Sequence, residues 1–302
     1  MEVMALRVLA ACLLLATPSV ASAQQGSSSR SGQLVLVGGT PWSVIQEWDG
    51  QRASLEIRGP NGATRGPLAS PGWIAAASNA NGIFVGIAHA GPAAVRALWV
   101  PIADGRPGTP APLTIARVAG DDRMPVGITV TPRPDGFAVI WQEGSTQSPS
   151  ALWQTFEARF DPSGQPAGAP RALGQVSWPI ADVLFLGGRY LVLLYFGGAS
   201  PEGTRLCAVH VDENGRPEEH PWWASRPGVI SEARLVAHGA RAIAVYRGGL
   251  DGRTLLEADV TEGSWGREAP EPRRHGSIAP DEAYGLRADG ARVRIERVPL
   301  GR

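Results

Sequence analysis

The sequence predicts an all-β fold, a β-propeller of four-stranded antiparallel blades, from three observations. First, glycines precede apolar runs at intervals of about 50 residues, which is a typical length for propeller blades. Second, those runs are rich in β-branched and aromatic residues, as strands are. Third, 38 glycines and 26 prolines supply many turns, and only the N-terminus has helical character.

Each repeat unit reads as four strands in order. A Gly turn joins strands 1 and 2, at Gly39, Gly82, Gly136, Gly188, Gly239 and Gly290. Strand 2 is the apolar run after that turn, for example 83–87, 137–141, 190–195 and 242–246. Strand 3 carries a leucine, at Leu55, Leu98, Leu152, Leu206 and Leu255. An Asp-Gly or Asn-Gly type hairpin then leads to strand 4, because these residues suit tight turns.

A four-stranded sheet of this kind buries both faces only when similar sheets stack around an axis. Five units begin near Gln33, Gly72, Val126, Pro179 and Val229. A sixth begins near Ala283 and is cut short by the end of the chain. We expect six blades, with five or seven as alternatives. A β-sandwich is the second choice, but it predicts no registered repeat.

The N-terminus has the pattern of a secretory signal peptide over residues 1–23. Arg7 precedes an apolar run at 8–15, and Ala21-Ser22-Ala23 forms a small-x-small cleavage site. Residues 24–32 read as a flexible leader, and 33–302 as a single propeller domain. We expect an exported protein, periplasmic or secreted, with no transmembrane segment in the mature chain and a monomeric state.

A lipoprotein is the minor alternative for the N-terminus. Leu9-Ala10-Ala11-Cys12 is similar to a lipobox, which would anchor the protein through Cys12, but the apolar run then follows the cysteine instead of preceding it. With Cys12 removed, Cys207 has no intrachain partner. We expect Cys207 to be a buried, inert thiol.

Composition excludes several function classes. The chain has 43% apolar and 19% charged residues, enough to form a core. All 28 basic residues are arginine, so chemistry that needs a lysine is excluded. The formal net charge of zero argues against nucleic acid as a partner.

One strand and hairpin carry a resemblance to a known group of proteins. Residues 136–142 read Gly, apolar run, Trp, and Arg159-Phe160-Asp161-Pro162-Ser163-Gly164-Gln165-Pro166 forms the hairpin of the same unit. This pattern resembles the repeats of exported β-propeller proteins of Gram-negative bacteria. The resemblance implies the fold only and transfers no substrate or catalytic residue.

Motifs with a known chemistry are absent from the sequence. We find no nucleophile elbow, dinucleotide loop or zinc-peptidase motif, and the five histidines lack metal-ligand spacing. We therefore expect neither a metal nor a cofactor.

Two groups of residues are candidates for ligand binding at one end of the propeller. The first is a set of rings where strand 2 ends: Trp48, His89, Trp141, Tyr195 and Tyr246. These rings either stack on a flat ligand or pack between blades. The second lies in the connections between units: Asp121, Asp122, Arg123, Trp178, Arg226, Arg274 and His275. Arginines there suit anionic ligand groups.

These observations support two functions. The main expectation is an exported, non-catalytic β-propeller that binds a protein, peptide or polysaccharide, or acts as a scaffold. The alternative is an extracytoplasmic hydrolase or lyase that collects acid and base groups from separate blades. In that case Asp121, Asp122 and His275 are the candidate acid and base groups.

Overall fold

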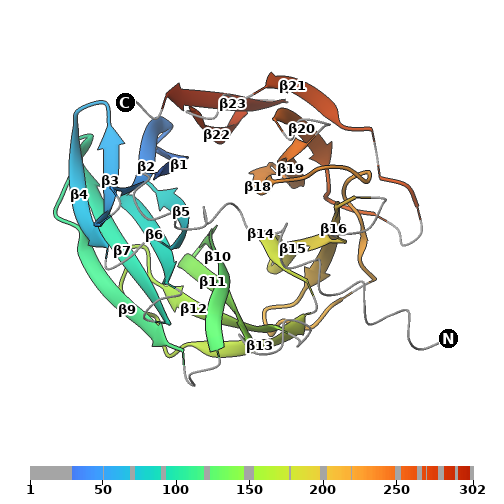
Figure 1. Cartoon of the computed structure of the whole chain (residues 1–302), viewed down its shortest axis with the longest axis horizontal. Helices are drawn as coiled ribbons and strands as arrows, with labels where there is room; N and C mark the ends of the chain where they lie inside the picture. The colour runs from blue at the N-terminus through green and yellow to red at the C-terminus, as the bar shows by residue number, and fades with distance from the viewer. Residues whose placement is uncertain are drawn as a thin grey trace.

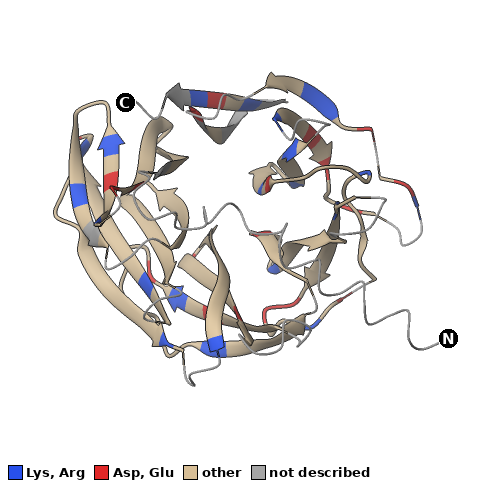
Figure 2. Ribbon diagram, in the orientation of Figure 1, with Lys and Arg blue, Asp and Glu red and all other residues tan. Residues whose placement is uncertain are grey.

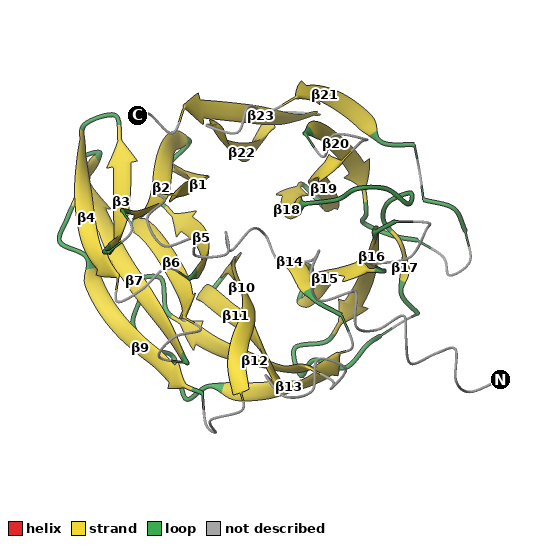
Figure 3. Ribbon diagram, viewed as in Figure 1, coloured by secondary structure: helices red, strands yellow, loops and turns green. Residues whose placement is uncertain are grey.

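A computed structural model describes residues 29–49, 51–68, 72–89, 93–118, 123–145, 153–176, 178–197, 203–218, 220–248, 253–263, 267–269, 271–277, 282–289 and 292–299. Every regular element in these ranges is a β-strand, so the all-β expectation is confirmed (Figure 3). Within them, no helix has the length and apolar character needed to cross a membrane. The expected signal peptide, Cys12 and the first residues of the leader lie outside the described residues.

The first three blades each run from an inner to an outer strand. Blade 1 consists of β1 (Ser29–Val37), β2 (Thr40–Trp48), β3 (Ala53–Gly59) and β4 (Gly62–Leu68). Blade 2 consists of β5 (Trp73–Asn79), β6 (Gly82–His89), β7 (Ala94–Ala103) and β9 (Ala111–Arg117), with the short β8 (Arg106–Pro107) paired to the end of β7. Blade 3 consists of β10 (Arg123–Arg133), β11 (Gly136–Ser145), β12 (Trp153–Phe160) and β13 (Arg171–Val176).

The remaining sheets complete the ring. Blade 4 consists of β14 (Ile180–Leu186), β15 (Arg189–Phe196), β16 (Arg205–Val211) and β17 (Trp222–Trp223). Blade 5 consists of β18 (Glu232–His238), β19 (Arg241–Gly248), β20 (Thr254–Asp259) and β21 (Arg273–Ser277). A last sheet holds only β22 (Glu282–Asp289) and β23 (Arg292–Pro299).

The sheets are arranged around one axis, with β1, β5, β10, β14, β18 and β22 innermost (Figure 1). The predicted β-propeller is therefore confirmed. The expected number of six blades is wrong, because the structure has five four-stranded blades. The last sheet has two strands among the described residues, and β22 packs beside both β1 and β18. A two-stranded sheet thus occupies the place between blades 5 and 1.

Apolar side chains fill the spaces between neighbouring blades. Between blades 2 and 3, the ring of Phe84 lies 5.3 Å from that of Phe137 and 4.5 Å from that of Phe160. Every residue of β6 is buried, as expected for a strand covered on both faces. Charged residues of both signs are spread around the ring (Figure 2). Stability therefore depends mainly on apolar packing between blades.

The predicted turns follow the expected chemistry. Gly136, at the turn between β10 and β11, has a φ of 135°, a conformation that other residues rarely adopt. In the hairpin after β12, the Asp161 carboxylate accepts hydrogen bonds from the backbone N–H groups of Ser163 (2.8 Å) and Gln165 (2.9 Å). Asp212 forms the same contacts after β16. These turns connect consecutive strands within a blade, so each blade keeps the order from inner to outer strand.

Candidate functional site

The inner strands begin at one end of the ring, which we call the entry face. At this face the first residue of β18, Glu232, pairs with Arg247 near the end of β19. The second strands end at the entry face because each is antiparallel to its inner strand. Side chains from β14, β15, β18, β19 and β22 meet there. We call the following residues the axial cluster: Asp182, Tyr195, Glu232, Arg234, Arg247 and Tyr284.

Glu232 is the anionic centre of the axial cluster. Its carboxylate lies 2.9 Å from an Nη of Arg234 and 3.0 Å from Nε of Arg247. The side chain of Glu232 is 30% exposed, so a ligand has access to it. Both guanidinium groups also lie against the ring of Tyr284, at 5.2 and 5.5 Å from its centroid.

Asp182 joins the inner strands of three blades. Its Oδ1 accepts hydrogen bonds from Thr129 Oγ1 on β10 (2.6 Å) and from its own neighbour, the Val183 N–H (2.8 Å). Its Oδ2 accepts a hydrogen bond from the Leu235 N–H on β18 (2.7 Å). The carboxyl group therefore lies where blades 3, 4 and 5 approach the axis.

The environment of Asp182 favours its neutral form. Burial raises the pKa of Asp182 above its ordinary value, against the opposing effects of its hydrogen-bond donors and of Arg234. Burial lowers the pKa of the Arg234 guanidinium, but the charge of Glu232 and the hydrogen bond to it oppose this effect, and the net shift of that pKa is upward. A carboxyl group with a raised pKa and an ion-paired carboxylate thus both act on Arg234.

Two tyrosines of the cluster keep their protons. Burial raises the pKa values of Tyr195 and Tyr284, and the charge of Glu232 adds to both effects. Tyr284 is 1% exposed, and its hydroxyl has no hydrogen-bond partner among the described residues. The Tyr195 hydroxyl hydrogen-bonds with the Ala233 backbone. Tyr284 therefore offers an unused hydroxyl to the cluster.

Pairs of carboxyl groups in unlike environments divide acid and base roles in hydrolytic sites. Asp182 has the features of the proton donor, and Glu232 has those of the proton acceptor. No group of three metal-ligating side chains occurs among the described residues. The chemistry that this arrangement supports is proton transfer.

The predicted ring residues have different surroundings. His89, Trp141 and Tyr246 are buried, and the last two belong to the packing between blades 2 and 3 and between blades 4 and 5. Trp48 is half-buried at the end of β2. Of the five predicted rings, the structure places Tyr195 in the axial cluster.

The predicted connection residues do not gather at one point. Asp121 and Asp122 lie outside the described residues. Arg274 and His275 lie on β21, the outermost strand of blade 5, where His275 Nε2 is 2.7 Å from a Glu257 oxygen. The structure therefore does not bring His275 to the axis.

The other connection residues lie at separate places on the entry face. Arg123 is the first residue of β10, and Trp178 precedes β14 with 38% of its surface exposed. Arg226 forms an ion pair of 2.7 Å with Glu271, which precedes the outer strand of blade 5. Of these three, Trp178 is nearest in sequence to the axial cluster, four residues before Asp182.

Sequence reasoning missed five of the six residues of the axial cluster: Asp182, Glu232, Arg234, Arg247 and Tyr284. A signal was present for two of them. Asp182 and Glu232 are charged residues just after the expected unit starts at Pro179 and Val229. Charged side chains at the start of an inner strand lie near the axis of a propeller.

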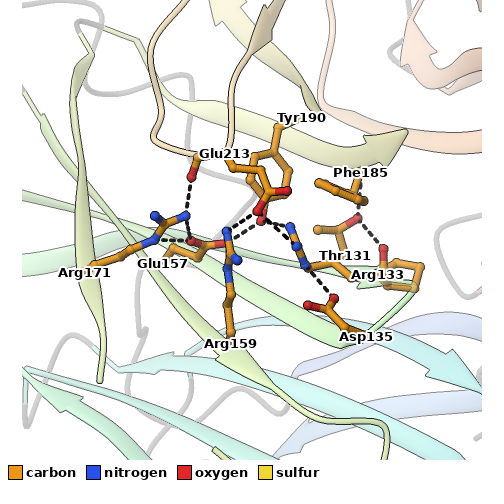
Figure 4. Close-up of polar contacts among 10 residues, drawn as sticks. Thr131, Arg133, Asp135, Glu157, Arg159, Arg171, Phe185, Tyr190 and Glu213 are labelled. Atoms are coloured by element: carbon orange, nitrogen blue, oxygen red, sulfur yellow. Dashed lines mark hydrogen bonds and ion pairs between the residues drawn. The ribbon is translucent and has the colours of Figure 1, made fainter. Parts of the chain in front are cut away.

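A second polar cluster joins blades 3 and 4 away from the axis (Figure 4). The fully buried Glu157 accepts hydrogen bonds from Arg159 Nε (3.0 Å), Arg171 Nε (2.6 Å) and the Tyr190 hydroxyl. Glu213 lies 2.8 Å from an Nη of Arg159. These charges neutralise one another across the blade interface. We call Glu157, Arg159, Arg171, Tyr190 and Glu213 the Glu157 clasp, and we interpret it as structural.

Comparison with known proteins shows the fold and no family. No family model matches the chain, and no curated protein matches it in sequence. Similar solved structures include a prolyl endopeptidase (13% identity, TM-score 0.42, covering 84% of this chain and 36% of that one) and the Bombyx mori GH32 β-fructofuranosidase BmSUC1 (9%, 0.48, 73% and 55%). An exo-1,5-α-L-arabinanase from a bovine ruminal metagenomic library is similar over 83% of this chain and 99% of its own, with 11% identity and a TM-score of 0.45. The chain spans only 36% and 55% of the first two proteins.

The main functional expectation is corrected by this comparison. The similar structures named in this comparison are mostly enzymes, among them a GH32 β-fructofuranosidase and two arabinanases, and not non-catalytic binding or scaffold modules. With identities of 8–13% and TM-scores of 0.40–0.48, these likenesses carry no conclusion about the activity of this chain. An activity therefore has to be argued from the side chains of this chain.

Proposed function

We propose that the protein is a hydrolase whose acid and base groups are Asp182 and Glu232 of the axial cluster. The observation that carries this proposal is the contrast between the two carboxyl groups. Burial raises the pKa of Asp182, whereas Glu232 is paired with Arg234 and Arg247. Two carboxyl groups in unlike surroundings are what acid–base hydrolysis needs.

The proposed step is a single hydrolytic displacement. Glu232 accepts a proton from a water molecule as the water oxygen bonds to the electrophilic carbon of the substrate. The bond from that carbon to the leaving oxygen breaks, and Asp182 transfers its proton to this oxygen. Arg234 and Arg247 hold the Glu232 carboxylate in place.

The test is hydrolysis of a panel of p-nitrophenyl glycosides and dye-linked polysaccharides. We expect Asp182→Asn and Glu232→Gln each to lower kcat by about 10²- to 10⁴-fold, the usual contribution of one acid or base group. His275→Ala serves as the control, since His275 lies on the outer strand β21 and should leave kcat unchanged. Full activity in both carboxyl variants, or no turnover of any substrate in the panel, would contradict the proposal.

We also propose that the reaction takes place outside the cytoplasm. The support is the signal-peptide pattern of residues 1–23. Mass spectrometry of the protein recovered from cell fractions should find a mature chain that starts at Gln24. An uncleaved chain in the cytoplasmic fraction would contradict this part of the proposal.

A further inference from the structure

The two arginines of the axial cluster carry more hydrogen-bond donors than Glu232 uses. Arg234 donates to one oxygen of Glu232 from Nε (3.1 Å) and from one Nη (2.9 Å), and Nε of Arg247 lies 3.0 Å from the other oxygen. A guanidinium group has five N–H donors. Among the described residues, the second Nη of Arg234 and both Nη groups of Arg247 have no acceptor. Most of the donors of Arg247 are therefore unused.

The strand register places these side chains together on one face of blade 5. Glu232 pairs with Arg247, and Arg234 follows two residues later on the same face of β18. The ring of Tyr284, from β22, lies against both guanidinium groups. The side chains of Arg234 and Arg247 are still 19% and 22% exposed. The two arginines thus lie between blade 5 and the last sheet, and a ligand at the entry face has access to them.

Positive charge is in excess at this point of the axial cluster. Two guanidinium groups face Glu232, which is the one carboxylate that ion-pairs with them among the described residues. Burial raises the pKa of Asp182, which favours the neutral form of that carboxyl group. In the Glu157 clasp, by contrast, Glu213 supplies a second carboxylate for the two arginines. The axial cluster lacks such a second partner, and the carboxylate of a ligand would supply it.

We propose that Arg247 and Arg234 bind a carboxylate group of the substrate, an inference about substrate class that rests on the proposed function. The planar fork of a guanidinium group matches a planar carboxylate and donates two parallel hydrogen bonds to it. One excess positive charge fits a group with a single negative charge. The protein would therefore prefer acidic substrates, such as glycosides of uronic acids, over neutral substrates of the same size.

The first experiment compares ligands of similar shape and different charge. Isothermal titration calorimetry measures the binding of D-glucuronate and D-galacturonate to the full mature chain, beside that of D-glucose and D-galactose. We expect the acids to bind about tenfold more tightly than the neutral sugars, because hydrogen bonds to a charged group are the stronger ones. N-acetylalanine supplies the same group from the end of a peptide and shows which source of carboxylate the site prefers. Equal binding of acids and neutral sugars, or no binding of any acid, would overturn the proposal.

The second experiment tests the arginine itself. Arg247→Gln should weaken the binding of the acids about tenfold and leave that of the neutral sugars unchanged. Arg189→Gln is the matched control, because Arg189 is a partly exposed arginine at the start of β15, at the opposite end of the ring. It should bind the acids like the wild type. Unchanged binding of the acids in Arg247→Gln would contradict the proposal. The comparison of ligands uses the wild type alone, so it decides the question even where Arg247→Gln does not fold.

The outcomes separate the two proposals. Binding of acids that depends on Arg247, with no hydrolysis by the wild type, contradicts the hydrolase and supports the carboxylate site. Hydrolysis that depends on Asp182, with equal kcat/KM for uronic acid glycosides and neutral glycosides, overturns the carboxylate site alone.

Discussion

At the scale of single residues, carboxylates of this protein serve two purposes. Glu232 and Asp182 lie near the axis, whereas Glu157 is enclosed by arginines between blades. The enclosed arrangement recurs in blade 1, where Glu56 accepts hydrogen bonds of 2.8 Å from Arg58 and from Arg65. In both blades the glutamate is on the third strand, one arginine follows it by two residues, and the other is on the fourth strand. We infer that this is a repeated structural device.

The Glu157 clasp should be important for stability. Glu157→Ala removes a fully buried carboxylate and takes one acceptor away from Arg159 Nε, Arg171 Nε and the Tyr190 hydroxyl. Loss of one partner of a buried ion pair typically costs about 3–5 kcal/mol of the free energy of unfolding. Urea denaturation followed by tryptophan fluorescence would measure this change.

A matched control is available on the surface. Arg189 and Glu218 form an ion pair of 3.0 Å with both side chains about 40% exposed, so Arg189→Ala should cost about 0–1 kcal/mol. Equal losses from Glu157→Ala and Arg189→Ala would show that the clasp contributes no more than a surface pair.

At the scale of elements, the strands and turns could be predicted but the positions of some polar residues could not. The predicted strand 2 segments at 83–87, 137–141 and 190–195 lie within β6, β11 and β15. Local pattern was sufficient there, because glycine turns and β-branched runs act within one hairpin. The surroundings of Asp182, in contrast, are formed by Thr129 and Leu235, which belong to two other blades. A local sequence pattern does not contain these contacts.

The place of His275 on an outer strand has a physical cause at the same scale. The connection 260–272 between β20 and β21 is long, so the segment that includes Arg274 and His275 forms the fourth strand of blade 5 instead of a link to the next sheet. Among the described residues, the repeat signal near residue 290 corresponds to one hairpin, formed by β22 and β23.

A substitution at Gly136 tests directly whether the turn between β10 and β11 requires a glycine. A Cβ there would overlap the carbonyl oxygen of Phe160, and the φ of 135° is unfavourable for alanine. We expect Gly136→Ala to lower the free energy of unfolding by about 1–3 kcal/mol. Gly127 has no neighbouring atom within 4 Å of a Cβ and an ordinary φ, so Gly127→Ala is the control. Thermal unfolding with equal Tm values for the two variants would contradict this explanation.

At the scale of the whole molecule, the axial cluster exists only because neighbouring sheets are assembled side by side. Its side chains come from β14, β15, β18, β19 and β22, and Asp182 also binds β10. Polar contacts also join neighbouring inner strands elsewhere in the ring. For example, the Gln33 side chain of blade 1 donates a hydrogen bond to the Ile74 carbonyl of blade 2 (2.8 Å). The proposed activity is thus a property of the assembled propeller, and separated blades would lack it.

The pH dependence of hydrolysis tests the central claim most directly. A general acid works only while protonated, so the rate should fall as pH rises through the raised pKa of Asp182. The measurement is kcat against pH for the wild type and for Asp182→Asn, on the best substrate of the panel. We predict that Asp182→Asn is slower by about 10²- to 10⁴-fold and lacks the fall at high pH. An Asp182→Asn variant with the rate and pH profile of the wild type would contradict the account.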